Sequence, residues 1–346
     1  MTILVLNSGS SSIKYKLFCK ETMEELFSGI KEEVTCHSVA INKILNRLKD
    51  EKIITSMTDI YCVGHRVVHG GDYFKTSVII NENVMNKIDE LSTLAPLHNP
   101  ANLAGIKAVQ DIFGDIKQVA VFDTAFHQTM PKYASIYPLP YEYYEKYGVK
   151  RYGFHGTSHQ YVAQKAADIL GKKLEDTNLI TLHLGNGASI CAIQHGKSID
   201  TTMGFTPLEG LMMGTRCGDI DASLPFYLQE KLNCTSDEIN NILNKQSGFK
   251  GMCGTSDLRE VIQLTDKGNE HAKLAIEIFI YRIKKYVGSY LMILEDVDAI
   301  VLTGGIGEHS ALVRDAIYKS TDKFNLTHLT IATNEELAIA TISKDL

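Results

Sequence analysis

This sequence lacks several features by which whole classes of protein are recognised. Its 346 residues include seven cysteines but no C-x-x-C pair, and an odd number of scattered thiols argues against a disulfide framework. No apolar run approaches the ~20 residues that a membrane span requires. The N-terminus begins directly with an apolar stretch and carries no basic leader. We therefore expect a cytoplasmic protein with reduced thiols and no membrane partner.

A general basic charge is also missing. The formal net charge is -6 at pH 7, which argues against a nucleic-acid partner. The composition, 44% hydrophobic and 22% charged, is ordinary for a soluble globular protein, and the length indicates about two domains. An anionic substrate must then be held by local arginine, lysine or backbone amide groups.

Three familiar motifs fail on inspection. The glycine-rich stretch after residue 303 has Ser310 where the last glycine of a dinucleotide-binding fingerprint belongs, which argues against NAD. A phosphate-binding loop ending at Lys197 would need glycine at the position of Cys191. His155 and His159 have helical spacing, but Gly156 stands where a zincin has glutamate. NAD, a P-loop and a zincin site are therefore all disfavoured.

Two hairpins with tips of small residues are present instead. Residues 179–183 and 189–193 read as strands joined through Gly185, Asn186 and Gly187. Residues 2–6 and 13–18 repeat this order around a serine-rich tip followed by Lys14, which indicates a duplicated domain. Backbone amides at such tips can converge on a phosphate, although the same patterns also fit plain turns.

Charged side chains stand at positions where a surface role is hard to argue. Arg216 lies in 204–221, a segment with neither helical nor strand periodicity, which predicts a loop lining a site. Arg66 follows a short strand at 61–63 that Gly64 interrupts, and it is either an anion ligand or part of a structural ion pair. Asp123 ends a buried strand at 119–122, where ligands of α/β proteins bind.

Helical periodicity and capping residues predict the remaining elements. We expect the helix that ends near Gly171 to be capped by Thr157 or Ser158, with His155 in the loop before it. A long apolar-striped helix at 270–294 should be buried against a sheet, and a strand at 297–302 leads into Gly304. Thr333 or Asn334 should cap the last helix. The other predicted helices are 38–50, 83–94, 100–113, 222–232, 236–243 and 257–265.

Several blocks together resemble the acetokinase family of acetate kinases over nearly the whole chain. The blocks are LNSGSSSIK (6–14), VGHRVVHGG (63–71), APLHNPAN (95–102), VFDTAFHQTMP (121–131), RYGFHGTSH (151–159), HLGNGAS (183–189), GFTPLEGLMMGTRCGDID (204–221), TGGIGE (303–308) and TNEEL (333–337). The resemblance implies an α/β protein with two actin-like (ribonuclease H-like) domains facing each other across an active-site cleft. The first domain would comprise 1–126 and 337–346. The second, 127–336, would carry the nucleotide site and the dimer interface.

The same resemblance implies a reaction. It is the reversible, Mg²⁺-dependent, in-line transfer of a phosphoryl group from ATP to acetate, giving acetyl phosphate and ADP, on a route to acetyl-CoA; Mn²⁺ is an alternative metal. The partners would be these substrates and a second copy of the chain. A propionate or other short-chain acyl kinase shares nearly all the motifs. A non-catalytic actin-like nucleotide-binding module is the second alternative.

Site residues follow from the resemblance position by position. Asp123, His155 and Arg216 match catalytic positions, and Arg66 matches the acetate ligand. Val68, Leu97, Phe154 and Pro207 match the walls around the acetate methyl group. Asn7 and Glu335 match magnesium positions. The nucleotide positions are Lys14, His183, Leu184, Gly185, Asn186, Gly187, Asp257, Leu258, Arg259, Gly305, Ile306, Gly307, Glu308 and His309.

The chain departs from the family pattern at identifiable places. His309, Cys217 and Ala332 stand where the family usually has asparagine, serine and proline. The segments 19–61 and 309–335 are shorter than usual. Both kinds of departure bear on nucleotide affinity and local stability.

Overall fold

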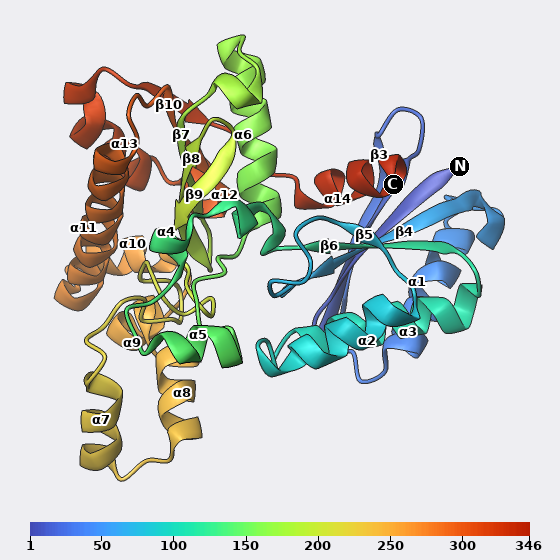
Figure 1. Cartoon of the computed structure of the whole chain (residues 1–346), viewed down its shortest axis with the longest axis horizontal. Coiled ribbons are helices and arrows are strands. Elements are labelled where there is room, and N and C mark those ends of the chain that lie inside the picture. Colours follow the sequence, from blue (N-terminus) through green and yellow to red (C-terminus); the bar gives the residue numbers. More distant parts are fainter. The chain divides into compact units, whose positions relative to one another are not determined.

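The computed structural model describes all residues, 1–346, as two compact units (Figure 1). Unit 1 comprises Met1–Gln128, Gly156–Tyr161 and Asn334–Leu346, and unit 2 comprises Thr129–His155 and Val162–Thr333. Each unit contains one β-sheet with helices packed against it. No helix combines the length and the apolar character that a membrane span requires.

Unit 1 is built on a six-stranded sheet in the order β3-β2-β1-β4-β6-β5. Strands β1, β2 and β3 form an antiparallel meander, while β1, β4 and β6 run parallel. The strands are β1 (Thr2–Ser8), β2 (Ser12–Cys19), β3 (Glu25–Glu32), β4 (Ile60–Val67), β5 (Val78–Ile79) and β6 (Lys117–Phe122). The helices are α1 (His37–Asp50), α2 (Glu82–Glu90), α3 (Asn99–Phe113) and, at the C-terminus, α14 (Glu335–Asp345).

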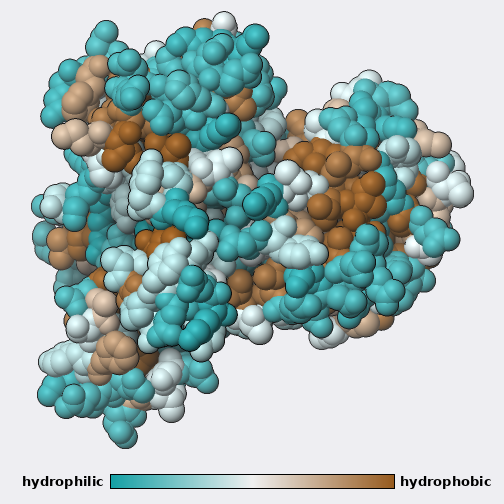
Figure 2. Space-filling view, viewed as in Figure 1, coloured by the Kyte–Doolittle hydropathy of each residue, from teal (hydrophilic) through white to brown (hydrophobic).

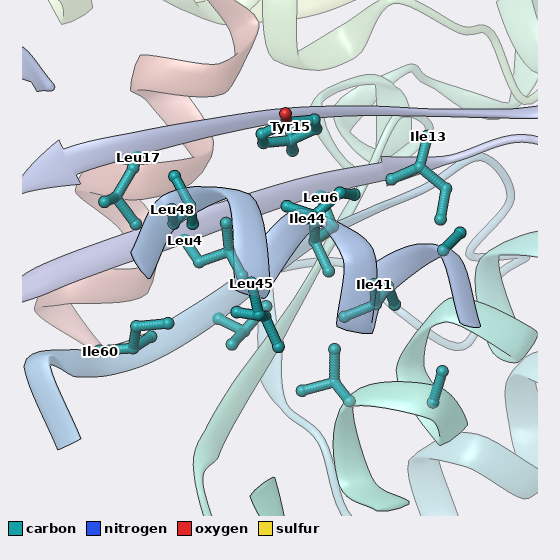
Figure 3. Close-up of a cluster of buried hydrophobic side chains, with 14 of the residues drawn as sticks. Leu4, Leu6, Ile13, Tyr15, Leu17, Ile41, Ile44, Leu45, Leu48 and Ile60 are labelled. Atoms are coloured by element: carbon teal, nitrogen blue, oxygen red, sulfur yellow. The ribbon is translucent and has the colours of Figure 1, made fainter. Parts of the chain in front are cut away.

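Successive side chains of β1 are buried on opposite faces of this sheet. Leu4 and Leu6 belong to a core that includes α1 residues such as Ile41 and Leu45, drawn in Figure 3. Ile3 and Val5 instead pack in a core with Ile339 and other residues of α14. The sheet is therefore covered on both faces, which explains why β1 reads as a continuous apolar run.

Unit 2 contains a five-stranded sheet in the order β11-β10-β7-β8-β9. Its strands are β7 (Leu179–Leu184), β8 (Ala188–Gln194), β9 (Lys197–Thr201), β10 (Ala299–Thr303) and β11 (Thr327–Thr330). Strands β7 and β10 are buried throughout. The helices are α4 (Lys132–Ser135), α5 (Tyr141–Tyr147), α7 (Leu224–Leu232), α8 (Ser236–Lys245), α9 (Gly248–Cys253), α10 (Leu258–Asp266), α11 (Glu270–Ile293), α12 (Gly304–His309) and α13 (Ala311–Thr321). Helix α6 (Gly156–Leu170) is divided between the units, with Gly156–Tyr161 in unit 1 and the remainder in unit 2.

Both predicted hairpins are confirmed as antiparallel pairs, β1 with β2 and β7 with β8. Two local predictions were wrong. Gly64 does not interrupt its strand, since β4 continues through it to Val67. The N-cap of α6 is His155 in a left-handed conformation (φ 57°), while Thr157 and Ser158 lie in the first turn. The helix begins earlier than predicted because the Gly156 N–H donates to the Asp123 carbonyl at 2.9 Å.

Candidate functional site

The charged centre of unit 1 is a bidentate pair between Arg66 on β4 and Asp123 just after β6. Arg66 Nε lies 2.9 Å from Asp123 Oδ1, and Nη2 lies 2.6 Å from Oδ2. The parallel register of β4 and β6 brings the two residues together, because Arg66 pairs with Val121, two residues before Asp123. Asp123 is 2% exposed at its side chain, whereas Arg66 is 21% exposed. The pair therefore presents the guanidinium, not the carboxylate, to solvent.

The environment holds Arg66 charged. Burial alone lowers the pKa of Arg66, but the carboxylates of Asp123 and Glu335 outweigh that effect and raise it. Burial raises the pKa of Asp123, and the Arg66 guanidinium opposes this rise. Glu335 Oε2 lies 3.8 Å from Arg66 Nε. Arg66 is therefore a protonated guanidinium fixed by Asp123, with the Glu335 carboxylate close to it.

The predicted magnesium residues and Lys14 lie in unit 1 as well. Asn7 is on β1, directly opposite Lys14 in the register of β1 and β2. Glu335 is in the first turn of α14, whose N-cap is Asn334 as one of the two predicted capping residues. Lys14 Nζ pairs with Glu336 at 2.6 Å, an acid that the sequence had not singled out. No group of three or more His, Cys, Asp or Glu side chains is placed to hold a metal ion by itself.

The four apolar positions predicted for the acyl pocket divide between the units. Val68 follows β4 directly and is buried, with its backbone N–H donating to Asn102 Oδ1 at 3.1 Å. Leu97 is 56% exposed in the turn before α3. Phe154, in unit 2, is buried. Pro207, also in unit 2, offers its carbonyl oxygen to Arg216 Nη1 at 3.0 Å.

In unit 2, His155 and Arg216 meet at the tip of the β7–β8 hairpin. A Cβ placed on Gly187 would lie 3.5 Å from His155 Nε2 and 3.6 Å from Arg216 Nη1, so both side chains reach the backbone at this glycine. His155 Nδ1 is 2.9 Å from Ser189 Oγ, and its ring stacks on that of His183 with centroids 4.2 Å apart. The hairpin thus fixes the imidazole next to Gly187.

Arg216 differs from Arg66 because no carboxylate partners its guanidinium. Its Nη1 donates to the Pro207 carbonyl and lies 3.6 Å from the Met213 sulfur. Burial lowers the pKa of Arg216 without any opposing charge. A partly buried cation held only by neutral acceptors favours an anion beside it. Arg216 and the tip of the hairpin therefore form an anion-binding arrangement.

A cavity of about 650 Å³ adjoins this hairpin in unit 2, within the usual size range of small-molecule sites. Most of its lining residues were predicted as nucleotide positions, namely Gly185, Asn186, Asp257, Leu258, Arg259, Gly305, Ile306 and His309. The sequence did not identify Ser256, Ile262 and Ser310, which complete the lining. Ile262 and Ser310 carry no local signal, because they are an ordinary helix residue and a helix cap.

Other predicted nucleotide residues support this cavity instead of lining it. Glu308 accepts hydrogen bonds from the N–H groups of Gly304 and Thr333, at 2.9 and 3.2 Å. Gly304 has φ +78° and lies so close to the Leu184 carbonyl that a side chain would clash. Gly307 is buried in α12, and His183 and Leu184 end β7. These residues hold α12 against the hairpin.

Two of the residues that line the cavity, Asp257 and Arg259, form an ion pair with each other. Asp257 is the N-cap of α10 and accepts from the Arg259 N–H at 2.9 Å, while its carboxylate binds the Arg259 guanidinium at 2.6 and 3.0 Å. Hydrogen bonds from Arg259 lower the pKa of Asp257 to about 2. The Asp257 carboxylate is therefore ionised across the physiological range and can accept hydrogen bonds from a ligand.

Comparison with known proteins agrees with this geometry. A model described as the acetokinase family matches residues 31–336. Acetate kinase from Acetivibrio thermocellus is 50% identical over 352 aligned residues, which cover 94% of this chain and 88% of the relative. Acetate kinase from Thermotoga maritima is 46% identical, and that alignment covers 100% of this chain and 98% of the relative. It is 397 positions long against 346 residues here, so the relative has segments that this chain lacks.

Solved structures match over the same extent. A propionate kinase from Francisella tularensis superimposes with a TM-score of 0.95 at 44% identity, covering 100% of this chain and 99% of that one. Acetate kinase from Porphyromonas gingivalis gives a TM-score of 0.93 at 42% identity, with 98% of each chain covered. The predicted α/β fold with two actin-like halves is confirmed. The chain belongs to the acetokinase family, and its members are phosphotransferases.

Proposed function

We propose that this chain is an acetate kinase, which transfers the terminal phosphoryl group of ATP directly and reversibly to acetate, giving acetyl phosphate and ADP. The observation that carries the proposal is the environment of Arg216. Its guanidinium, which has no carboxylate partner, and the His155 ring both lie next to Gly187, and the neighbouring Gly185 and Asn186 line the 650 Å³ cavity. A nucleotide in that cavity can direct its phosphates to Arg216, whose guanidinium is not neutralised by a carboxylate.

Phosphoryl transfer from ATP to acetate requires chiefly the stabilisation of negative charge on the phosphates. Carboxylic acids comparable to acetate have a pKa near 4, so the nucleophile is already ionised at neutral pH and needs no strong base. The obstacle is repulsion between this carboxylate and the phosphates. In-line phosphoryl transfer is accelerated mainly by positioning and by cations at the developing charge. Arg216 and His155 supply donors for that purpose.

Arg66 is the proposed ligand of the acetate carboxylate. Asp123 occupies Arg66 Nε and one N–H of Nη2, and so fixes the plane of the guanidinium. The Nη1 group of Arg66 then remains to bind the acetate carboxylate. The carboxylates of Asp123 and Glu335 keep the guanidinium protonated, because they raise the pKa of Arg66. In this assignment Asp123 orients Arg66 and need not accept a proton from the substrate.

Magnesium is the proposed metal, with manganese as an alternative. Mg²⁺ prefers oxygen ligands and is commonly held by one or two protein oxygens together with substrate phosphates. The side-chain oxygens of Asn7 and Glu335 are donors of this kind, and both belong to unit 1. The metal would neutralise phosphate charge when bound. Glu336 keeps the nearby Lys14 ammonium in place by their ion pair.

Propionate is the second candidate acceptor, favoured by the close match to a solved propionate kinase. Val68 is buried one residue after β4 and two residues after Arg66, so its bulk can limit the acyl chain there. One methylene changes discrimination by only about 1–3 kcal/mol. We propose that acetate is preferred, that propionate reacts with lower kcat/KM, and that Val68→Ala raises the propionate-to-acetate ratio. A wild type that favours propionate would make the protein a propionate kinase.

The test of the function is hydroxylamine trapping. The purified chain is incubated with ATP, Mg²⁺ and a series of acids from formate to butyrate, and acyl hydroxamate is measured. We expect product with acetate, and none when the metal is chelated or ATP is omitted. If no acid gives product while the protein still binds ADP, the chain is a nucleotide-binding module and the proposal is wrong.

We also propose that the chain acts as a homodimer through unit 2, without nucleic-acid or membrane partners, in the cytoplasm. Large apolar side chains stay exposed on α7 and α11 of unit 2, including Phe226, Tyr227, Tyr281 and Met292. Figure 2 shows hydrophobic patches among the hydrophilic residues of the viewed face, and the largest of them lies over unit 1. Multi-angle light scattering should give twice the mass of one chain, and a monomer at micromolar concentration would contradict the proposal.

A further inference from the structure

A partly buried polar network in unit 2 has no part in the chemistry described above. It consists of Tyr137, Arg151 and Glu209, with Asp200 at its edge. These residues come from three separate stretches of the chain and meet beside residues 204–210, which begin the loop that carries Arg216. Buried ionic groups are retained at a cost in desolvation, so their role needs a specific reason.

Arg151 binds the backbone at the start of this loop. Its Nη1 lies 2.9, 3.1 and 3.3 Å from the carbonyl oxygens of Thr201, Thr202 and Met203. Its Nη2 pairs with Glu209 Oε1 at 2.6 Å, and its Nε lies 3.9 Å from Asp200. Burial lowers the pKa of Arg151, but Glu209, Tyr137 and Asp200 together raise it. One side chain thus ties the end of β9 to a residue six positions beyond Met203.

Tyr137 closes the same loop from the other side. Its hydroxyl donates to Glu209 Oε2 and accepts from the Phe205 N–H at 2.9 Å. Burial and the Glu209 carboxylate both raise the pKa of Tyr137, so it stays a neutral donor. Gly204 lies directly against Glu209 and Tyr137, and a side chain there would overlap both. Residues 204 to 209 are therefore pinned at each end.

The pinned segment contains Pro207, whose carbonyl oxygen accepts the hydrogen bond from Arg216 Nη1. The rest of the loop is tied to other parts of unit 2. The Met213 N–H donates to the Arg216 carbonyl, and the Gly214 N–H donates to the Asn186 carbonyl, both at 3.0 Å. The Arg216 backbone is thus bonded to Met213, and Gly214 connects this part of the loop to Asn186 at the tip of the β7–β8 hairpin. The position of its guanidinium depends on Pro207.

We propose that Tyr137, Arg151 and Glu209 are positioning residues for Arg216: they hold Pro207, and through its carbonyl oxygen they hold the Arg216 guanidinium where the transferring phosphoryl group needs it. The proposal rests on the proposed function. A loop without helix or sheet has few backbone bonds of its own, so side chains must fix its shape. Small misplacements of a catalytic group reduce rate strongly even when the mutation is remote.

The test is a double-mutant cycle between Tyr137→Phe and Arg216→Ala. In this cycle kcat is measured for the wild type, for each single variant and for the double variant. Tyr137→Phe removes only the hydroxyl that joins Glu209 to Phe205. We expect it to lower kcat by about tenfold and to change the Kd for ADP by less than about twofold. In the Arg216→Ala background the same change should have less than a twofold effect, because the residue that it positions is absent.

Glu209→Gln is a second variant with the same expected pattern, in case Tyr137→Phe alone perturbs the fold. Tyr318→Phe is the matched control, since the Tyr318 hydroxyl bonds Leu329 and Thr330 elsewhere in unit 2. We expect it to leave kcat unchanged in both backgrounds. Equal effects of Tyr137→Phe with and without Arg216, or no effect on kcat at all, would overturn the positioning role alone. An inactive wild type would instead overturn the proposed function and the positioning role with it.

Discussion

Arg66 in unit 1 and Arg216 in unit 2 show how the surroundings give residues of one type different properties. Arg66 is fixed by a buried carboxylate with two short hydrogen bonds, whereas Arg216 has only neutral acceptors. A paired cation can orient a substrate at little cost, while an unpaired one is ready for charge that develops during the reaction. This difference supports the proposed division of roles, with acetate binding at Arg66 and phosphoryl stabilisation at Arg216.

Arg216→Ala tests this division. Removing one preorganised donor from developing charge typically costs about 2.7–4 kcal/mol, or a 10²–10³-fold loss of kcat. We expect a loss of that size, with the Kd for ADP changed far less. Steady-state kinetics and calorimetric titration measure the two effects. Arg47→Ala, which removes an exposed arginine of unit 1, is the control, and an unchanged kcat in Arg216→Ala would remove Arg216 from the mechanism.

His65 on β4 gives a prediction for pH. It is fully buried, its Nε2 lies 2.8 Å from Gln118 Oε1, and burial lowers its pKa to about 4. An unfolded histidine has a pKa near 6.5, so below that pH the unfolded chain takes up a proton that the folded chain refuses. This residue should destabilise the fold progressively from pH 6.5 to pH 4, by about 3 kcal/mol in all.

Urea denaturation at a series of pH values measures this effect. The His65→Gln variant is the comparison, because other groups also titrate in this range and contribute equally to both proteins. We expect the difference in unfolding free energy between wild type and variant to shift in favour of the variant as the pH falls. A difference that does not vary with pH would show that His65 does not titrate in this way.

Arg66, Asp123 and Arg216 were singled out by their place after a strand or in an irregular glycine-rich loop, and His155 only by the family resemblance. The structure pairs Arg66 with Asp123 in unit 1 and places His155 and Arg216 near Gly187 in unit 2. Ser256 and Ile262 could not be found in this way, because only the folding of α10 against the β7–β8 hairpin makes them pocket residues. The ion pair of Lys14 with Glu336 joins residues more than three hundred positions apart and has no local signal.

At the scale of elements, periodicity predicted the long helices and both hairpins, and it failed where a tertiary contact decides. Strands β3, β9 and β11 were missed, since their exposed or polar residues give little apolar pattern. Gly64 was read as a strand break from its residue type alone. In the structure it lies inside β4, where the strand passes under α14.

Gly64→Ala tests this explanation. A Cβ at Gly64 would lie 2.5 Å from Ser343 Oγ and 2.6 Å from Ile339 Cγ2, so α14 would have to move away. Overpacking of this kind costs about 1–3 kcal/mol. We expect a loss of that size in urea denaturation. Gly288→Ala is the control, because Gly288 is an exposed helix position with open space, and alanine there should be neutral or stabilising by up to about 1 kcal/mol. Equal effects would show that α14 does not need the close approach.

At the scale of the whole molecule, unit 1 is assembled from three stretches of the chain, the last of which is the C-terminus. Helix α14 follows the last residue of unit 2 and contributes Ile339 and Ala340 to the core that includes Ile3, Val5 and Cys62. Helix α14 therefore covers one face of the first sheet. The same helix places Glu335 beside Arg66, so it contributes both to this core and to the charged centre of unit 1.

Ile339→Ala should consequently destabilise unit 1 far more than its position near the C-terminus suggests. Replacing a buried isoleucine by alanine costs about 2–5 kcal/mol, and Ile339 is 1% exposed. Urea denaturation would measure the loss of stability. Hydrogen exchange of the β1 and β4 backbone amides would show that the loss lies in unit 1. Ile169→Ala is the matched control, since Ile169 is 62% exposed and should change stability by less than about 0.5 kcal/mol. If the two substitutions have the same effect, α14 is an appendage, and the sheet of unit 1 must be stable without it.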